Sequence, residues 1–116
     1  GFGRSVAKAS RFILARPEAG AAAFLKMFPE TAPRGSSKAK AVHAIVQAIG
    51  RRTKLYLPPY PGAAMGSINP AEFQAEAKLD HLSVANFAPL YTNALIAEIN
   101  NFDAKAIAAQ AAAYRV

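Results

Sequence analysis

Apolar residues recur through much of the chain at the spacing of one helix face. The clearest stripe has members at i, i+3, i+4 and i+7: Val42, Ile45, Val46 and Ile49. This spacing predicts a helix that buries one side. Ser36 or Ser37 is placed to cap its first turn, and Gly50 is placed to end it in a left-handed conformation.

Prolines and capping residues predict further helices on both sides of this one. They are expected at residues 3–15, 17–28, 70–79 and 82–102, with a final helix after Asp103. Pro17 and Pro70 suit the first position of a helix, and Asn69 and Asp103 suit the cap. The helix over 82–102, kinked at Pro89, is predicted from a second stripe at steps of three and four: Val84, Phe87, Tyr91, Leu95 and Ile99.

The segment from about residue 52 to 69 interrupts the helical pattern. Its prolines fix the φ angle and remove backbone donors, which predicts extended chain and excludes helix and central strand. A disordered linker would lack its apolar and aromatic residues. We therefore expect it to lie on another surface, either its own helices or a neighbouring subunit. The residues expected to bind a partner are Tyr56, Leu57, Pro58, Pro59 and Tyr60.

These elements predict a mostly α fold of five to six short helices with no sheet, forming a single small domain over residues 1–116. Alanine supplies 28 of the 116 residues, so much of the hydrophobic content consists of single methyl groups. Alanine favours helix but buries little area, whereas burying a Leu or Phe gains about 1.5–3 kcal/mol. The sequence therefore predicts strong local helix around a thin core.

Charge is distributed unevenly along the chain, whose net charge is +7. No acidic residue occurs between residues 31 and 71, and a basic patch is predicted from the cations of this stretch: Arg34, Lys38, Lys40, Arg51, Arg52 and Lys54. Such asymmetry indicates a negatively charged partner, whether an acidic protein surface, anionic lipid or nucleic acid. The Tyr56 ring beside these cations suits an RNA base, but no recognised nucleic-acid motif is present.

The helix expected at 3–15 is amphipathic, basic and free of acidic residues. At 100° per residue its cations Arg4, Lys8 and Arg11 fall together, and they are expected to reach anionic lipid headgroups. Phe2, Val6 and Ile13 fall on the opposite side. This pattern is typical of organellar import sequences and equally of a surface helix with a charged outer face.

Candidate chemistry is sparse. The chain has no cysteine, and His43 and His81 lack the spacing of a metal site. Asp80, His81 and Ser83 are the residue types of a hydrolase triad, but a triad is assembled from separate elements. No apolar run is long enough to span a membrane. The sequence thus predicts no enzyme activity, catalytic residue, cofactor, metal or transmembrane span.

Together these features favour a non-catalytic structural accessory subunit that binds other subunits of a large complex. From the import interpretation of this helix we expect the subunit in the mitochondrion, peripheral to the inner membrane, in a complex of the respiratory chain or ATP synthase. The alternative is an RNA-contacting protein of an organellar ribosome, and we favour protein partners over nucleic acid.

Overall fold

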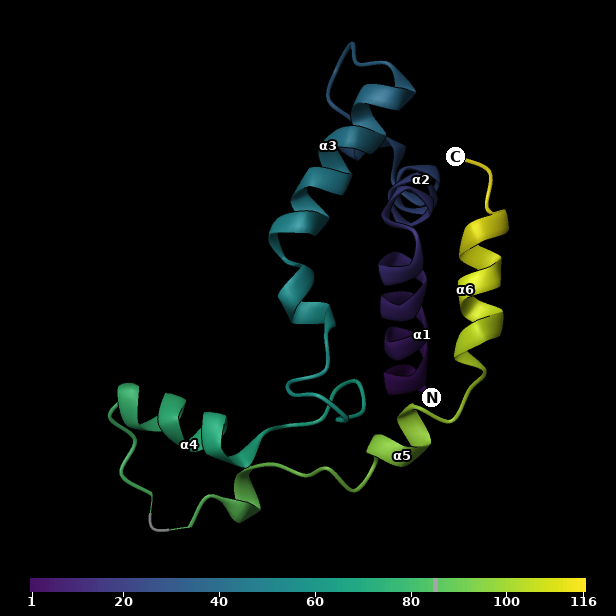
Figure 1. Cartoon of the computed structure of the whole chain (residues 1–116). Coiled ribbons are helices and arrows are strands. Elements are labelled where there is room, and N and C mark those ends of the chain that lie inside the picture. Colours follow the sequence, from purple (N-terminus) through teal and green to yellow (C-terminus); the bar gives the residue numbers. More distant parts are fainter. Residues whose placement is uncertain (85) are drawn as a thin grey trace. The chain divides into compact units, whose positions relative to one another are not determined.

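The computed structural model describes residues 1–84 and 86–116, which form two compact units (Figure 1). Unit 1 comprises Gly1–Leu57 together with Phe102–Val116, and unit 2 comprises Pro58–Asn101. Helices make up 63% of the chain and the described residues contain no strand, which confirms the predicted mostly α class. A single domain over the whole chain stays a prediction.

Unit 1 is described in full and consists of helices joined by short connections. They are α1 (Phe2–Ala15), α2 (Pro17–Met27), the 3-10 turn η1 (Pro29–Thr31), α3 (Lys38–Arg51), the 3-10 turn η2 (Thr53–Tyr56) and α6 (Ala104–Ala113). The predicted caps are confirmed: the Ser37 hydroxyl accepts a hydrogen bond from the Lys40 N–H at 3.4 Å. The Asp103 carboxylate accepts two, from the N–H groups of Lys105 and Ala106, at 2.9 and 3.0 Å.

The four α-helices of unit 1 pack through small residues. Figure 1 shows α6 alongside α1, although they lie at opposite ends of the chain, and α2 is seen nearly end-on. The buried residues of the unit are Ala7, Ser10, Ala19, Ala21, Ala22, Ala41, Val42 and Ala111. Among the described residues no large side chain is fully buried, so the core is as thin as the composition predicts.

Arg16, at the corner between α1 and α2, holds the end of α6. Its guanidinium Nη1 donates hydrogen bonds to the carbonyls of Ala112 and Tyr114, both at 2.9 Å, and lies 3.5 Å from the Ala111 carbonyl. Carbonyls at a helix C-terminus lack partners within the helix and carry partial negative charge, so a guanidinium satisfies them well. Beside this contact the Phe12 and Tyr114 rings meet edge to face, 5.8 Å between centroids.

Unit 2 contains shorter elements. Its described residues form α4 (Pro70–Leu79), the 3-10 turn η3 (Ala88–Leu90) and the four-residue α5 (Ile96–Ile99). The predicted Asn69 cap is confirmed, because its side chain accepts a hydrogen bond from the Ala71 N–H at 3.1 Å. Phe73 of α4 packs against the rings of Phe87 and Tyr91, with centroids 6.2 and 5.2 Å away.

Two asparagines fix the second half of the extended segment to its own chain. Asn93 pairs with both backbone groups of Ile68: its Oδ1 accepts from the N–H at 2.9 Å, and its Nδ2 donates to the carbonyl at 3.0 Å. Asn100 Nδ2 donates to the carbonyl of the buried Met65 at 2.9 Å. Side-chain amides thus replace the backbone partners that irregular chain lacks.

The helix predicted over 82–102 is wrong for most of its length. The described part holds only η3 and α5 as helix, and Ala85 lies outside the described residues. Polar side chains capture the backbone instead: Asn86 Oδ1 accepts from the Ala88 N–H at 3.0 Å, and Thr92 Oγ1 from the Ala94 N–H at 3.1 Å. Such local hydrogen bonds compete with helix formation.

Two smaller expectations are also corrected. Gly50 lies inside α3 without a positive φ, and the helix ends at Arg51 with Arg52 as its C-cap. The extended segment begins later than residue 52, because η2 forms one 3-10 turn before Leu57 and Pro58. Leu57 precedes Pro58, and a residue before proline disfavours the helical conformation. Leu57 is therefore extended, and the 3-10 turn ends before it.

Candidate functional site

The residues predicted to bind a partner, Tyr56 to Tyr60, lie where the two units meet in sequence. In unit 1, Tyr56 is half-buried and Leu57 is 49% exposed. In unit 2, Pro58 and Pro59 are half-buried and Tyr60 is 47% exposed. Leu57 and Tyr60 are therefore the members available for contact with another molecule, and the partner itself stays a prediction.

Tyr56 lines a hollow of about 300 Å³ on the side of α3, here called the Tyr56 hollow. Its other lining residues are Ile45, Ala48, Ile49, Arg51 and Arg52. The structure therefore places one aromatic ring and two guanidinium groups around an apolar floor. This combination suits a ligand that has an apolar or planar part and a negative charge.

The predicted basic patch is exposed throughout but divides into two groups. Arg34, Lys38 and Lys40 lie before and within the first turn of α3, whereas Arg51 ends the helix and Arg52 and Lys54 follow it. Residues 40 and 51 are separated by about 16 Å along the helix axis at 1.5 Å per residue. Lys38 and Lys40 lie in the first turn, where cations oppose the helix dipole, so they do not stabilise α3.

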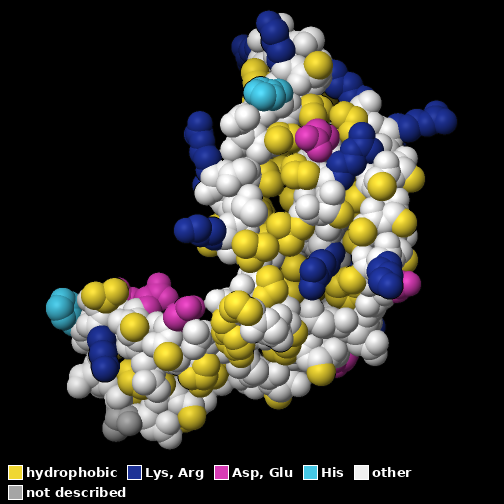
Figure 2. All heavy atoms as spheres, viewed as in Figure 1, with side chains coloured by type: hydrophobic (Ala, Val, Ile, Leu, Met, Phe, Trp, Pro, Cys, Tyr) yellow, Lys and Arg dark blue, Asp and Glu magenta, His cyan; other side chains and the backbone are white. Residues whose placement is uncertain are grey.

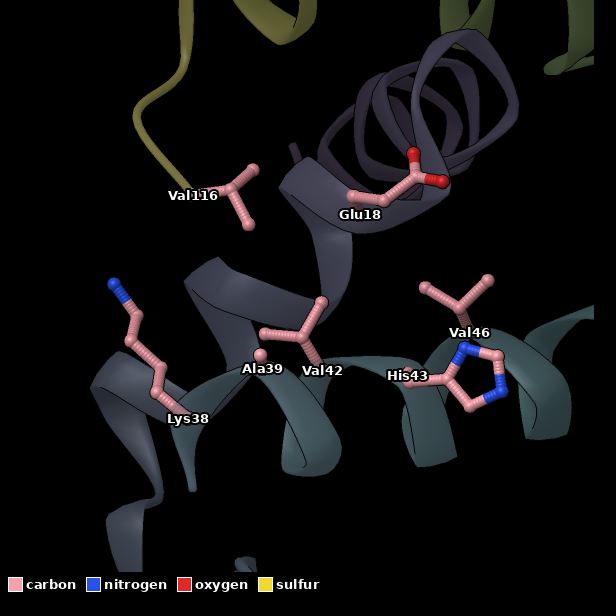
Figure 3. A pocket seen from close by; sticks show the side chains of 7 residues that line it. All are labelled: Glu18, Lys38, Ala39, Val42, His43, Val46 and Val116. Atoms are coloured by element: carbon pink, nitrogen blue, oxygen red, sulfur yellow. The ribbon is translucent and has the colours of Figure 1, made fainter.

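A second hollow, of about 470 Å³, surrounds His43 between α2, α3 and the C-terminal segment (Figure 3). Its titratable side chains are Glu18, Lys38 and His43. No hydrogen bond or ion pair joins these three described residues, and the Glu18 carboxylate in Figure 3 does not point at the His43 ring. Catalysis needs a base and an acid or nucleophile within hydrogen-bond reach, which this hollow does not provide.

His81 lies apart from this hollow, in unit 2 at the end of α4. It is exposed and adopts φ +56° directly after Asp80, the C-cap of the helix. Among the described residues no three His, Cys, Asp or Glu side chains are arranged to hold a metal ion. Asp80 and His81 form the turn that follows α4, where the Leu82 N–H donates to the Ala77 carbonyl at 2.9 Å, and Ser83 lies beyond this turn.

An apolar groove of about 490 Å³ in unit 1 was not anticipated from the sequence. It is bounded by α1, α2 and α6, chiefly by Ala9, Phe12, Ile13, Phe24, Met27 and Ile107, and is called here the α1–α2 groove. The sequence signal was present in the apolar side of α1. That side is outward, because Phe2 is 86% exposed while the small residues Ala7 and Ser10 are buried.

The two units carry opposite charge. Unit 1 holds thirteen Lys and Arg against three Asp and Glu, a formal side-chain charge of +10. Unit 2 holds one Lys against four Asp and Glu, a charge of −3. Figure 2 shows dark-blue side chains gathered mainly around the part that contains α3, with magenta side chains beside α4.

No known protein family, curated protein or solved structure matches the chain. In the described part of the chain, no helix has the length and apolarity required to cross a bilayer. The structure thus defines a small all-α protein whose candidate site is a set of exposed surfaces.

Proposed function

We propose that the chain is a non-catalytic structural accessory subunit that binds other protein subunits of a large complex. One observation carries this proposal: the described core consists mainly of alanine, while many large apolar side chains are exposed. The exposed set includes Phe2, Met27, Leu55, Leu79 and Leu95. Phe24 and Met27 line one groove together, and exposed apolar side chains that lie together are characteristic of interaction surfaces.

The physical argument concerns where the stabilising burial occurs. Burying a large apolar side chain contributes about 1.5–3 kcal/mol, and an alanine methyl group much less. A chain that leaves its large residues outside gains most of this free energy only when a neighbour covers them. The exposed Leu57 and Tyr60 are side chains of this kind within the predicted partner segment.

The class of complex that we propose is a mitochondrial membrane complex of the respiratory chain or ATP synthase, with the chain lying peripherally. The amphipathic α1, which has no acidic residue, supports import of the protein into an organelle. Anionic lipid headgroups are a further proposed contact of Arg4, Lys8 and Arg11. The Lys8 ammonium group lies 5.9 Å from the centroid of the Phe102 ring, within reach of a cation–π interaction. A lipid headgroup that bound Lys8 would therefore contact an ammonium group that also interacts with this ring.

A second candidate function, contact with organellar ribosomal RNA, is favoured by the Tyr56 hollow. Arg51 and Arg52 could bind phosphates there while the Tyr56 ring stacks on a base. The protein-subunit proposal ranks above it because the exposed apolar side chains extend far beyond this hollow.

Paired substitutions separate the two candidates. Leu57→Ser with Tyr60→Ser is expected to reduce the amount of protein recovered in its native assembly about tenfold or more, because half-exposed anchors become buried in an interface. Arg51→Gln with Arg52→Gln is expected to leave recovery within about twofold, as rim charges contribute little. Recovery is measured by quantitative mass spectrometry of the assembly after gradient centrifugation.

The matched control is Gln47→Ser with Gln74→Ser, which changes one exposed polar side chain in each unit outside the predicted segment. We expect it to behave as the wild type. Loss of recovery with the arginine variant but not with the Leu57/Tyr60 variant would favour the RNA candidate.

A further inference from the structure

The α1–α2 groove continues into an apolar strip along α1. Phe2, Val6, Ala9 and Ile13 share one side of this helix, and Ala9 and Ile13 also line the groove. Residues 2 and 13 are about 16 Å apart along the axis, which corresponds to three helical turns. Phe2, Val6 and Ala9 are exposed and Ile13 is half-buried, so the strip is open over the first two turns of α1.

The residues that line the groove differ in size. Ala9 of α1 and Ala23 of α2 carry single methyl groups, whereas Phe12, Phe24 and Met27 are large. Small lining residues leave room for the side chains of another helix, and methionine adapts its shape to a partner. Met27 is 72% exposed at the rim, so little of its surface is used within this chain.

Charge identifies the kind of occupant. The polar side chains that line the groove are Lys8 and Gln110, and no acidic side chain is among its described lining residues. The groove belongs to the unit of charge +10, whose field favours anions within a Debye length of about 8 Å.

We propose that the α1–α2 groove binds an amphipathic helix of a neighbouring subunit, with acidic residues flanking its apolar face. Leucine-sized anchors of that helix, spaced i, i+3 or i+4, i+7 and i+11, lie along the strip from Phe2 to Ile13. Glu or Asp side chains beside them approach Lys8. This inference rests on the proposed function and specifies one contact surface and the chemistry of its partner.

A bilayer surface fits the same residues less well. Arg4 and Arg11 project from the side of α1 opposite Phe2 and Val6, and Lys8 alone of the three cations lines the groove. A membrane that touched the apolar strip would therefore lie away from Arg4 and Arg11, whereas an interfacial helix binds lipid with its apolar and its basic side chains together. A flat bilayer also cannot fill a concave groove between three helices.

The test uses the full chain and two synthetic 18-residue peptides. Both carry leucine at the anchor spacing, and the remaining positions are mainly glutamate in one peptide and lysine in the other. Fluorescence anisotropy measures binding, and a third probe consists of phosphatidylcholine vesicles containing cardiolipin. We expect the glutamate peptide to bind at least about tenfold more tightly than the lysine peptide.

Two variants locate the binding. Ala9→Trp places a large ring in the groove from an exposed position and is expected to weaken the glutamate peptide about tenfold or more. Ala44→Trp, on an exposed position of α3, is the matched control and is expected to leave binding unchanged.

Three outcomes overturn the inference: equal binding of both peptides, no binding of either, or binding that Ala9→Trp does not affect. Vesicle binding that Ala9→Trp abolishes, in the absence of peptide binding, also overturns it and assigns the groove to lipid. Peptide binding does not require the native assembly, so its failure leaves the proposed function standing.

Discussion

Replacing Arg16 with alanine is expected to lower the free energy of unfolding by about 2–3 kcal/mol. The guanidinium group donates to the Ala112 and Tyr114 carbonyls at 2.9 Å and joins the corner of α1 and α2 to the end of α6. Charged hydrogen bonds contribute about 1.5–3 kcal/mol, and a cation at a helix C-terminus adds about 0.3–1 kcal/mol. Partial exposure of Arg16 reduces the total to the stated range. Urea unfolding followed by circular dichroism measures the change.

The matched control is Arg11→Ala, which removes a half-buried guanidinium of α1 that holds no helix end. We expect a change below about 0.5 kcal/mol for this variant. Arg16→Lys keeps the charge but loses the planar fork, so it should recover only part of the stability. If Arg16→Ala and Arg11→Ala change stability equally, Arg16 does not fasten α6.

Gly20→Ala is expected to lower the free energy of unfolding by about 1–3 kcal/mol, although alanine is the better helix former. A Cβ atom at Gly20 would lie 2.8 Å from Ile13 Cγ1 and 3.5 Å from Ile13 Cβ, because α1 and α2 approach closely there. The neighbouring side chain would have to move, which disturbs the packing of both helices. Thermal and urea unfolding measure the loss.

Gly50→Ala should have the opposite sign. An added Cβ meets no atom within 4 Å and the residue lies inside α3, so Gly50→Ala is expected to raise the free energy of unfolding by about 0.5–1 kcal/mol through the smaller entropy loss on folding.

Ile13→Ala should relieve the clash that an alanine at Gly20 creates. The Ile13→Ala/Gly20→Ala double variant should therefore be more stable than the sum of its single variants predicts. Additive effects, or a stabilising Gly20→Ala, would contradict this close approach.

Local signals in the sequence predicted much of the fold. Ser37, Asn69 and Asp103 act as caps through hydrogen bonds to N–H groups within three residues, so a short window contains the whole interaction. The apolar stripe on α3 also predicted the helix from nearby residues, and its member Val42 is buried against Ala21 and Ala22.

Features that depend on distant residues were not predictable in this way. Arg16 and its carbonyl partners are 95–98 residues apart, and Asn93 pairs with Ile68 across 25 residues. The apolar stripe over 82–102 suggested helix because its spacing is helical, yet Asn86 and Thr92 bind backbone groups two residues on and Asn93 binds Ile68. No pattern of hydrophobic positions encodes that competition.

Of the candidate surfaces, the sequence indicated the partner segment and the basic residues but not the α1–α2 groove. Leu57 and Tyr60 are exposed as a partner segment requires, and the six predicted cations are all exposed. The α1–α2 groove was missed because the apolar side of α1 suggested a buried face. The structure buries the adjacent small-residue side instead, through Ala7 and Ser10.

The central claim is membership of a large protein complex, and native isolation tests it most directly. The tagged protein is purified from its source in mild detergent, with and without nuclease, and its companions are identified by mass spectrometry. We predict co-migration with a large membrane assembly that survives nuclease and high salt. Recovery with ribosomal RNA that nuclease or salt removes, or recovery as a monomer without companions, would contradict the account.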